Sequence, residues 1–200
     1  MRQLALGISP PPEPTLENFV PGANAELVAR LRALAAGQLA ENVVYLWGER
    51  GSGRSHLLRA CAKAGIFTAD DVEILTDEEQ VALFNRINEA RQSGGAVIAA
   101  GSAPPAQLAL RDDLRSRLGG GLVYQVKPLT DAERAVFLRA EAERRGIRLA
   151  DEVIWYLLTH VRRDMPSLGA ILDELDRTSL ERQRHVTLPL VRDALKSLEK

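Results

Sequence analysis

A glycine-rich segment at residues 48–55, with the sequence GERGSGRS, constrains this chain more than any other feature. It directly follows a run of β-branched and aromatic residues at 43–47, which is typical of a buried strand. Its spacing matches the phosphate-binding pattern G-x4-G-K-[ST], except that Arg54 replaces the lysine. In such a loop the backbone N–H groups surround phosphate oxygens, and the next helix directs the positive end of its dipole at them. The segment therefore predicts a phosphate site; the alternative is a glycine-rich turn between a strand and a helix.

Arg54 affects which ligand this loop would hold. A lysine ammonium is a compact charge that fits between β- and γ-phosphates, whereas a guanidinium is wider and prefers a bidentate grip. We therefore expect the loop to retain a diphosphate better than it positions a γ-phosphate. The hydroxyl of Ser55 is placed to bind Mg²⁺. The loop thus predicts a site for ADP or ATP with Mg²⁺ that holds nucleotide rather than hydrolysing it rapidly.

Two acidic residues, Asp70 and Asp71, follow the next apolar run at 66–69. Acids at the end of a strand, downstream of a phosphate-binding loop, resemble a Walker B element. Asp70 would then share Mg²⁺ with Ser55, and Asp71 would orient a water molecule. Paired acids at strand ends are also common without any such function, so this prediction depends on the phosphate loop.

The chain changes character near Pro128. Before it, short apolar runs alternate with helical patterns, which predicts an α/β fold with a parallel, doubly wound sheet. After it, capping residues and apolar spacing predict helices, and a short piece near Val186 is the remaining strand candidate. We expect a flexible tail at 1–14, an α/β base at 15–128 and a helical lid at 129–200. The predicted strands lie at 43–47, 66–69, 96–100 and 122–126, and the later helices at 130–146, 151–162, 166–182 and 188–198.

The overall composition excludes several classes of protein. A formal net charge of −1 provides no basic field that would attract DNA or an anionic membrane. Cys61 is the single cysteine, so an internal disulfide and a multi-cysteine metal site are both excluded. The three histidines, His56, His160 and His185, lack the spacing of metal ligands. With no signal peptide and no apolar run of membrane-spanning length, the chain is expected to be cytoplasmic and not to bind specific DNA sequences directly.

Two arginines, Arg115 and Arg117, lie just before the glycines at 119–121. One interpretation is a charged helix end on the surface. The other is an arginine finger, a guanidinium presented across an interface to the γ-phosphate of a neighbouring protein. The spacing alone does not decide between these two interpretations. It also does not decide which of the two arginines would be the finger.

Together these segments resemble the DnaA family of AAA+ replication-initiator ATPases. They are most similar to its short Hda-type homologues, which inactivate DnaA after initiation. The resemblance implies an AAA+ base with a helical lid, ADP as a ligand, and Arg117 as a finger that promotes hydrolysis of DnaA-bound ATP. The segments that carry it, in order, are 15–24, 47–58, 69–73, 114–118 and 186–191. The implied nucleotide site comprises Phe19, Val20, Gly48, Gly51, Ser52, Gly53, Arg54, Ser55 and His56, with Ser55 and Asp70 at the metal.

The first residues resemble the clamp-binding pentapeptide of the same family. Gln3, Leu4 and Leu6 would enter the apolar groove of the DNA polymerase III sliding clamp (its beta subunit), and the prolines at 10–14 would form an extended tether. Gly7 is smaller than the residue that ends the strongest form of this motif. The resemblance therefore implies DnaA and the sliding clamp as partners, and a homodimer is also compatible with the sequence.

The chain departs from the family pattern in ways that keep other functions open. The stretch before Asp70 is too short for a further strand that the family has there, so we expect the sheet to lack an edge strand; a stretch missing from the sequence at Gly65 would have the same effect. Pro166 replaces a nucleotide-sensing arginine, and residues 101–103 lack the acid and arginine expected after the third strand. The alternatives are an AAA+ ATPase, similar to a clamp loader, that hydrolyses its own ATP, and a scaffold that has lost nucleotide.

Overall fold

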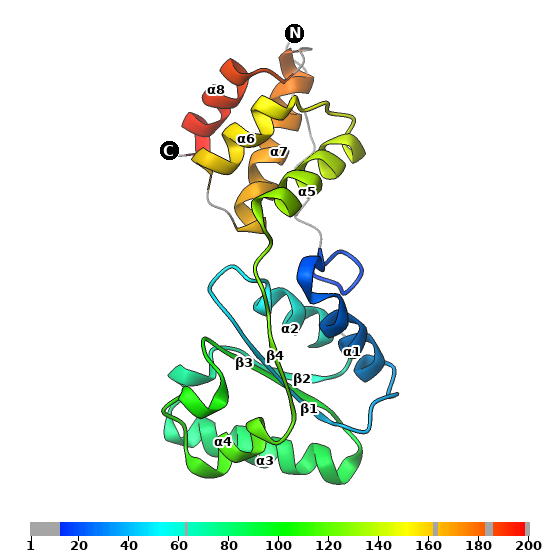
Figure 1. The fold of residues 1–200 in the computed structure, drawn as a ribbon, viewed down its shortest axis with the longest axis vertical. Helices are drawn as coiled ribbons and strands as arrows, with labels where there is room; N and C mark the ends of the chain where they lie inside the picture. The colour runs from blue at the N-terminus through cyan, green and yellow to red at the C-terminus, as the bar shows by residue number, and fades with distance from the viewer. Residues whose placement is uncertain (1–12, 63, 162–163, 183–185, 199–200) are drawn as a thin grey trace. The chain divides into compact units, whose positions relative to one another are not determined.

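The computed structural model describes residues 13–62, 64–161, 164–182 and 186–198, and the chain divides into two compact units after Pro128. Glu13–Pro128 form an α/β unit, and a helical unit begins at Leu129 (Figure 1). Within the described residues, no helix combines the length and the apolar character needed to cross a membrane. The predicted clamp-binding residues Gln3, Leu4 and Leu6 lie outside the described residues.

A parallel sheet forms the centre of the α/β unit, as predicted. Its strand order is β2-β3-β1-β4, and every neighbouring pair is parallel. Because all the strands run the same way, their carboxyl ends meet at one edge of the sheet, where ligand sites of α/β proteins form. The strands are β1 (Val43–Trp47), β2 (Phe67–Ala69), β3 (Val97–Gly101) and β4 (Leu122–Gln125).

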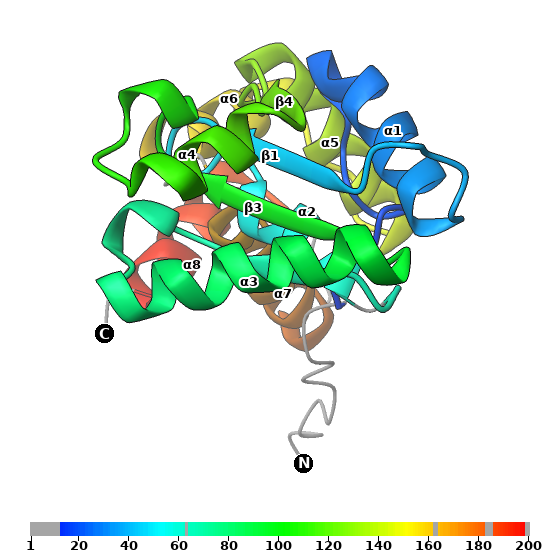
Figure 2. The same cartoon turned by 90° about the horizontal axis from the view of Figure 1, so that it is seen from below.

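Helices cover both faces of the sheet, because successive side chains of each strand point to opposite faces. Val44 and Leu46 of β1 pack in one core with α1 and α2. Val43 and Tyr45 of the same strand pack in a second core with α3 and α4. Figures 1 and 2 show these two pairs of helices on opposite sides of the sheet. The helices are α1 (Ala25–Ala35), α2 (Arg54–Ala62), α3 (Asp77–Ser93) and α4 (Asp112–Gly119).

Capping boxes begin two helices, and each follows the Thr-x-x-Glu pattern that predicts such a box, at 76–79 and at 130–133. At α3 the Thr76 hydroxyl accepts from the N–H of Glu79, and the Glu79 carboxylate accepts from the N–H of Thr76 over 2.8 Å. Thr130 and Glu133 form the same reciprocal pair at the start of the first lid helix. Each box satisfies two backbone N–H groups that the start of a helix leaves without an intrahelical partner.

β2 forms one edge of the sheet, and no described strand pairs with its outer side. In the turn after α2, the N–H of Gly65 donates to the carbonyl of Ala62, and the chain passes directly into β2. In the part of the chain that the structure describes, the sheet therefore lacks a strand beyond β2, in agreement with the prediction. Phe67 of β2 is 40% exposed, and the guanidinium carbon of Arg86 on α3 lies 5.2 Å from the centre of its ring. This contact covers apolar surface at an edge that is open to pairing with another chain.

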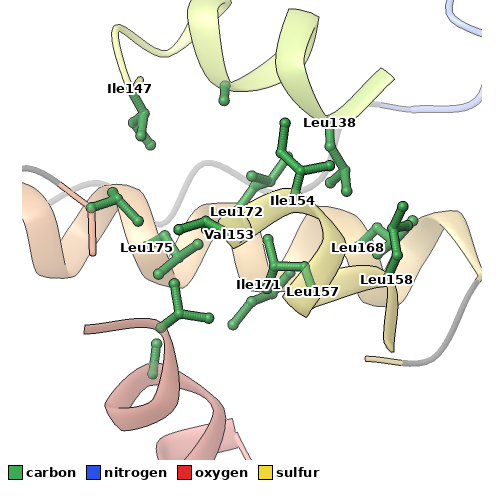
Figure 3. Packing of buried hydrophobic residues seen from close by; sticks show 14 of the residues in the cluster. Leu138, Ile147, Val153, Ile154, Leu157, Leu158, Leu168, Ile171, Leu172 and Leu175 are labelled. Carbon is green, nitrogen blue, oxygen red and sulfur yellow. The ribbon is translucent and has the colours of Figure 1, made fainter. Parts of the chain in front are cut away.

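The helical unit packs its helices around one apolar core. Figure 3 shows Leu138, Ile154 and Leu172, which come from three different helices, turned toward one another in this core. Val186 is buried but lies outside any strand, so the strand suggested for it by the sequence is wrong. The helices are α5 (Asp131–Arg144), α6 (Asp151–His160), α7 (Met165–Arg182) and α8 (Leu188–Leu198).

Candidate nucleotide site and arginine finger

The predicted phosphate loop connects β1 to α2 at the carboxyl edge of the sheet. Gly51 and Gly53 have φ values of +83° and +101°, which residues with a side chain rarely adopt. Gly48 is constrained by a close approach instead, because a Cβ there would lie 2.5 Å from the carbonyl oxygen of Val126, just after β4. The loop therefore needs glycine at these positions, for its backbone shape and for its contact with the neighbouring strand.

The N-terminal segment folds back over this loop. The ring of Phe19 lies against Gly53, where a Cβ would be 2.7 Å from Phe19 Cε2. His56, in the first turn of α2, has its ring centre 5.4 Å from that of Phe19, and its Nε2 is 2.9 Å from the carbonyl oxygen of Thr15. Val20 is half-buried. The structure thus brings Phe19 to the loop, next to His56 of α2, and its apolar ring is of the kind that receives a base.

Asn24 joins this N-terminal segment to the end of β4. Its Nδ2 donates to the carbonyl oxygen of Lys127 over 2.8 Å and to that of Pro21 over 3.0 Å, and its Oδ1 accepts from the N–H of Lys127 over 2.8 Å. The residue is 4% exposed. One buried side chain therefore pairs three backbone groups, two of which are distant in sequence. This keeps the segment that carries Phe19 attached to the sheet.

The structure also brings Ser55 and Asp70 together. Ser55 Oγ donates to Asp70 Oδ2 over 2.6 Å. A hydroxyl and a carboxylate are the hard oxygen ligands that Mg²⁺ takes at nucleotide sites, where phosphate and water supply the others. Among the described residues, no group of three or more His, Cys, Asp or Glu is placed to hold a metal ion. A magnesium ion at Ser55 and Asp70 would therefore depend on the phosphates of a nucleotide.

Arg54 is turned into the protein. Its side chain is 9% exposed, and its Nη2 lies 3.4 Å from Oδ1 of Asp71, whose backbone is in the left-handed region with φ +45°. The ion pair occupies the acid that was expected to orient water, a contact that the sequence did not predict. Arg54 Nη1 and Ser52 Oγ are buried and have no hydrogen-bond partner among the described residues. Oε2 of Glu73 is buried without such a partner as well. Since buried polar groups without partners are costly, the donors of Arg54 and Ser52 fit an anionic ligand such as a phosphate, whereas the Glu73 oxygen does not.

Glu73 is a part of the site that the sequence did not predict. Its Oε1 accepts from the N–H of Ser102 over 2.9 Å, which links the segment after β2 to the end of β3. Burial raises the pKa of Glu73, but the hydrogen bonds that it accepts, from Ser102 above all, together with the positive charge of Arg54, outweigh burial and hold this pKa below its ordinary value. Tyr45 lies nearby and donates its hydroxyl to the carbonyl of Ala103 over 2.9 Å. Glu73 and Tyr45 thus hold the residues that follow β3.

Arg115 and Arg117 have different surroundings on α4. Arg115 forms an ion pair with Asp112, one turn earlier in the helix. Arg117 is exposed and makes no ion pair with any residue that the structure describes. Its guanidinium carbon lies 5.7 Å from the centre of the Phe84 ring on α3. A guanidinium without a carboxylate partner is available to an outside anion, and of these two arginines Arg117 is the one in that state among the described residues.

Comparison with known proteins identifies the family. A family model described as the lid domain of Hda matches residues 131–195. An uncharacterized protein of Haemophilus influenzae is 34% identical over an alignment of 228 residues, which spans 97% of this chain and 98% of that protein. The chain belongs to the Hda-like family of DnaA-related AAA+ proteins. Because the alignment is longer than the 200-residue chain, part of the relative has no counterpart in this Hda-like protein.

Solved structures share the fold of this Hda-like protein. Domain III of DnaA from Thermotoga maritima superposes with a TM-score of 0.72 at 22% identity, over 93% of this chain and 97% of that chain. The replication initiator DnaA bound to AMPPCP and single-stranded DNA gives a TM-score of 0.70 at 23% identity, over 86% and 68% of the two chains. A RuvB variant from Thermotoga maritima gives 0.62 at 14% identity, over 94% and 72%. These similarities confirm the AAA+ fold with a helical lid.

Proposed function

We propose that this Hda-like protein is a negative regulator of replication initiation that promotes hydrolysis of the ATP bound to DnaA. In this proposal Arg117 is an arginine finger that acts on the γ-phosphate of ATP held by DnaA. The protein's own loop holds ADP with Mg²⁺, and the tail at 1–14 binds the sliding clamp. Membership of the Hda-like family supports this function, because it relates the chain to DnaA.

The observation that carries the proposal is the exposure of the Arg117 side chain, together with its lack of a carboxylate partner among the described residues. A finger in trans must be exposed and must keep its positive charge until it meets the phosphate of its partner. Arg117 is exposed and without a carboxylate partner among the described residues, whereas Arg115 is paired with Asp112. A correctly placed finger is worth about 10³- to 10⁵-fold in the rate of phosphoryl transfer. A single accessible arginine is therefore enough to account for a strong regulatory effect.

The protein's own site is better suited to holding nucleotide than to hydrolysing it. Arg54 and the loop backbone would receive the phosphates, Ser55 and Asp70 would hold Mg²⁺, and Phe19 would contact the base. When bound, the metal would neutralise phosphate charge. Oδ1 of Asp71 lies 3.4 Å from Nη2 of Arg54, and this ion pair competes with the use of the same oxygen to orient a water molecule. In solved structures DnaA itself binds the ATP analogue AMPPCP, which supports nucleotide as the ligand.

Hydrolysis assays with the proteins separate and combined test this function. DnaA loaded with ATP should convert it to ADP faster when this protein and DNA-loaded clamp are present, whereas this protein alone should turn over ATP slowly. Deleting residues 1–8 should abolish binding to the clamp in a pull-down, together with the clamp-dependent part of the stimulation. Unchanged clamp binding would refute the assignment of the tail, and no stimulation of DnaA under any condition would refute the regulatory function.

A second candidate function is an AAA+ ATPase, similar to a clamp loader, that hydrolyses its own ATP. The hydrogen bond of 2.6 Å between Ser55 and Asp70 favours it, because such an enzyme needs an intact pair of magnesium ligands. A steady-state assay on the isolated protein separates the two functions. Turnover of about 1 s⁻¹ or more, abolished by Asp71→Asn, would favour the ATPase over the regulator.

A further inference from the structure

Arg117 lies in the last turn of α4, in a region that contains two other arginines. Nη2 of Arg111 lies 3.0 Å from Oδ2 of Asp113, and Arg115 is paired with Asp112. The acids at the start of α4 are thus both occupied by arginines. Arg117 is the member of this group whose charge is not neutralised by a carboxylate among the described residues.

Phe84 is the residue against which Arg117 rests. The guanidinium carbon lies 5.7 Å from the ring centre, which is within the range of a cation–π contact. Phe84 is half-buried against the core that α3 and α4 share, so its ring is anchored while part of it stays accessible to Arg117. An aromatic ring attracts a cation through its quadrupole and does not neutralise it, as a carboxylate would. The contact with Phe84 therefore orients Arg117 without neutralising its charge.

We propose that Phe84 is a positioning residue for Arg117, and this proposal rests on the arginine-finger function proposed above. Ordering a long side chain such as arginine in a complex costs free energy, because several of its bonds rotate freely on the surface. Contact with Phe84 restricts Arg117 before it meets the γ-phosphate, so less conformational freedom is lost as the bound complex reaches the transition state. In the reaction, the water oxygen bonds to the γ-phosphorus, the bond to the leaving oxygen of ADP breaks, and the proton of the water goes to solvent.

The test compares hydrolysis of DnaA-bound ATP by the wild type and by Phe84→Leu and Phe84→Tyr, with DNA-loaded clamp present. Phe84→Leu should lower the maximal stimulated rate by about 2- to 5-fold, which is the effect of losing one cation–π contact at an exposed site. The concentration that gives half-maximal stimulation should stay the same, because Arg117 acts on the γ-phosphate in the transition state and not in docking. Phe84→Tyr keeps the ring face and should restore the wild-type rate.

A second arginine–phenylalanine pair in the same unit provides a matched control. The guanidinium of Arg86 lies 5.2 Å from the ring centre of Phe67 at the open sheet edge. Phe67→Leu removes the same kind of contact and should leave the maximal rate unchanged. Thermal melting of each variant shows whether it is folded. If Phe84→Leu is unstable, a folded Phe84→Tyr variant with a lowered maximal rate would still overturn the proposal, because it keeps the ring face.

The outcomes distinguish this proposal from the function on which it rests. If Arg117→Ala stimulates DnaA as well as the wild type does, the finger function fails and the role of Phe84 fails with it. If Arg117→Ala abolishes stimulation while Phe84→Leu keeps the full maximal rate, the positioning role alone is refuted. A change confined to the half-maximal concentration would also refute it, because Phe84 would then act in docking.

Discussion

Replacing Asn24 by alanine should destabilise the α/β unit by about 2 kcal/mol, from the loss of hydrogen bonds to buried or partly buried groups. The wild-type side chain pairs both the N–H and the carbonyl of Lys127, each over 2.8 Å, and the carbonyl of Pro21 over 3.0 Å. A buried backbone group without a partner costs roughly 1–3 kcal/mol. Lys127 is an exposed residue, so water can reach part of its backbone, and the lower end of this range applies to each group.

Urea unfolding measures this loss if the signal comes from the α/β unit alone. The chain has two tryptophans, Trp47 at the end of β1 and Trp155 on α6. In a Trp155→Phe background the fluorescence reports on Trp47 and therefore on the unit that contains Asn24. The midpoint should fall with an unchanged slope, and the free energy of unfolding should drop by about 2 kcal/mol.

Asn18 provides a matched control for this substitution. It also uses its side chain in hydrogen bonds, accepting from the N–H of Thr15 over 2.9 Å and donating to the carbonyl of Glu13 over 2.8 Å, but these bonds are exposed and local. Asn18→Ala should therefore cost less than about 1 kcal/mol. Equal losses in the two variants would refute the argument that the link between Asn24 and Lys127 stabilises the unit.

Three further predictions follow from the site and the sheet edge. Ser55→Ala should weaken the Mg²⁺-dependent part of ADP binding by about 10- to 100-fold, measured by calorimetry with and without EDTA, and equal affinities would contradict the metal site. Because the folded pKa of Glu73 lies below its ordinary value of 4.5, its carboxylate stabilises the fold above that pH, and this contribution is lost as the pH falls through the folded pKa. Glu73→Gln should accordingly reduce the loss of stability as the pH falls below 4.5 in urea titrations, and an unchanged pH dependence there would count against it. Arg86→Ala should uncover Phe67 and increase self-association in light scattering, whereas a fully monomeric variant would show that the contact does not protect the edge.

The strands and caps could be predicted from the sequence because each depends on residues close together in the chain. The run at 43–47, the box at Thr76 and the box at Thr130 carry their own local signals. The proximity of Ser55 and Asp70 was also accessible, since both follow strands whose parallel arrangement puts their carboxyl ends at one edge. Local sequence patterns therefore predict the sheet and the edge of the sheet at which the site lies.

The directions of side chains within the site depend on contacts that sequence spacing does not encode. Arg54 turns inward because Asp71, in a left-handed conformation, offers it a carboxylate. Glu73 meets Ser102 because β2 and β3 are neighbours, and its place three residues after Asp70 was the sole hint. The contact of Arg117 with Phe84 joins two helices that are separate in the chain, so no local spacing marks it.

The most direct test measures hydrolysis of labelled ATP bound to DnaA in the presence of DNA-loaded clamp. It compares three forms of this protein. The wild type and Arg115→Ala should both release labelled phosphate rapidly, because Arg115 is already paired with Asp112. Arg117→Ala should lower the stimulated rate by about 10³-fold or to the rate of DnaA alone, while its fold and its own ADP binding are kept. Rapid hydrolysis with Arg117→Ala, or loss of hydrolysis with Arg115→Ala alone, would contradict the central claim that Arg117 acts on the nucleotide of another protein.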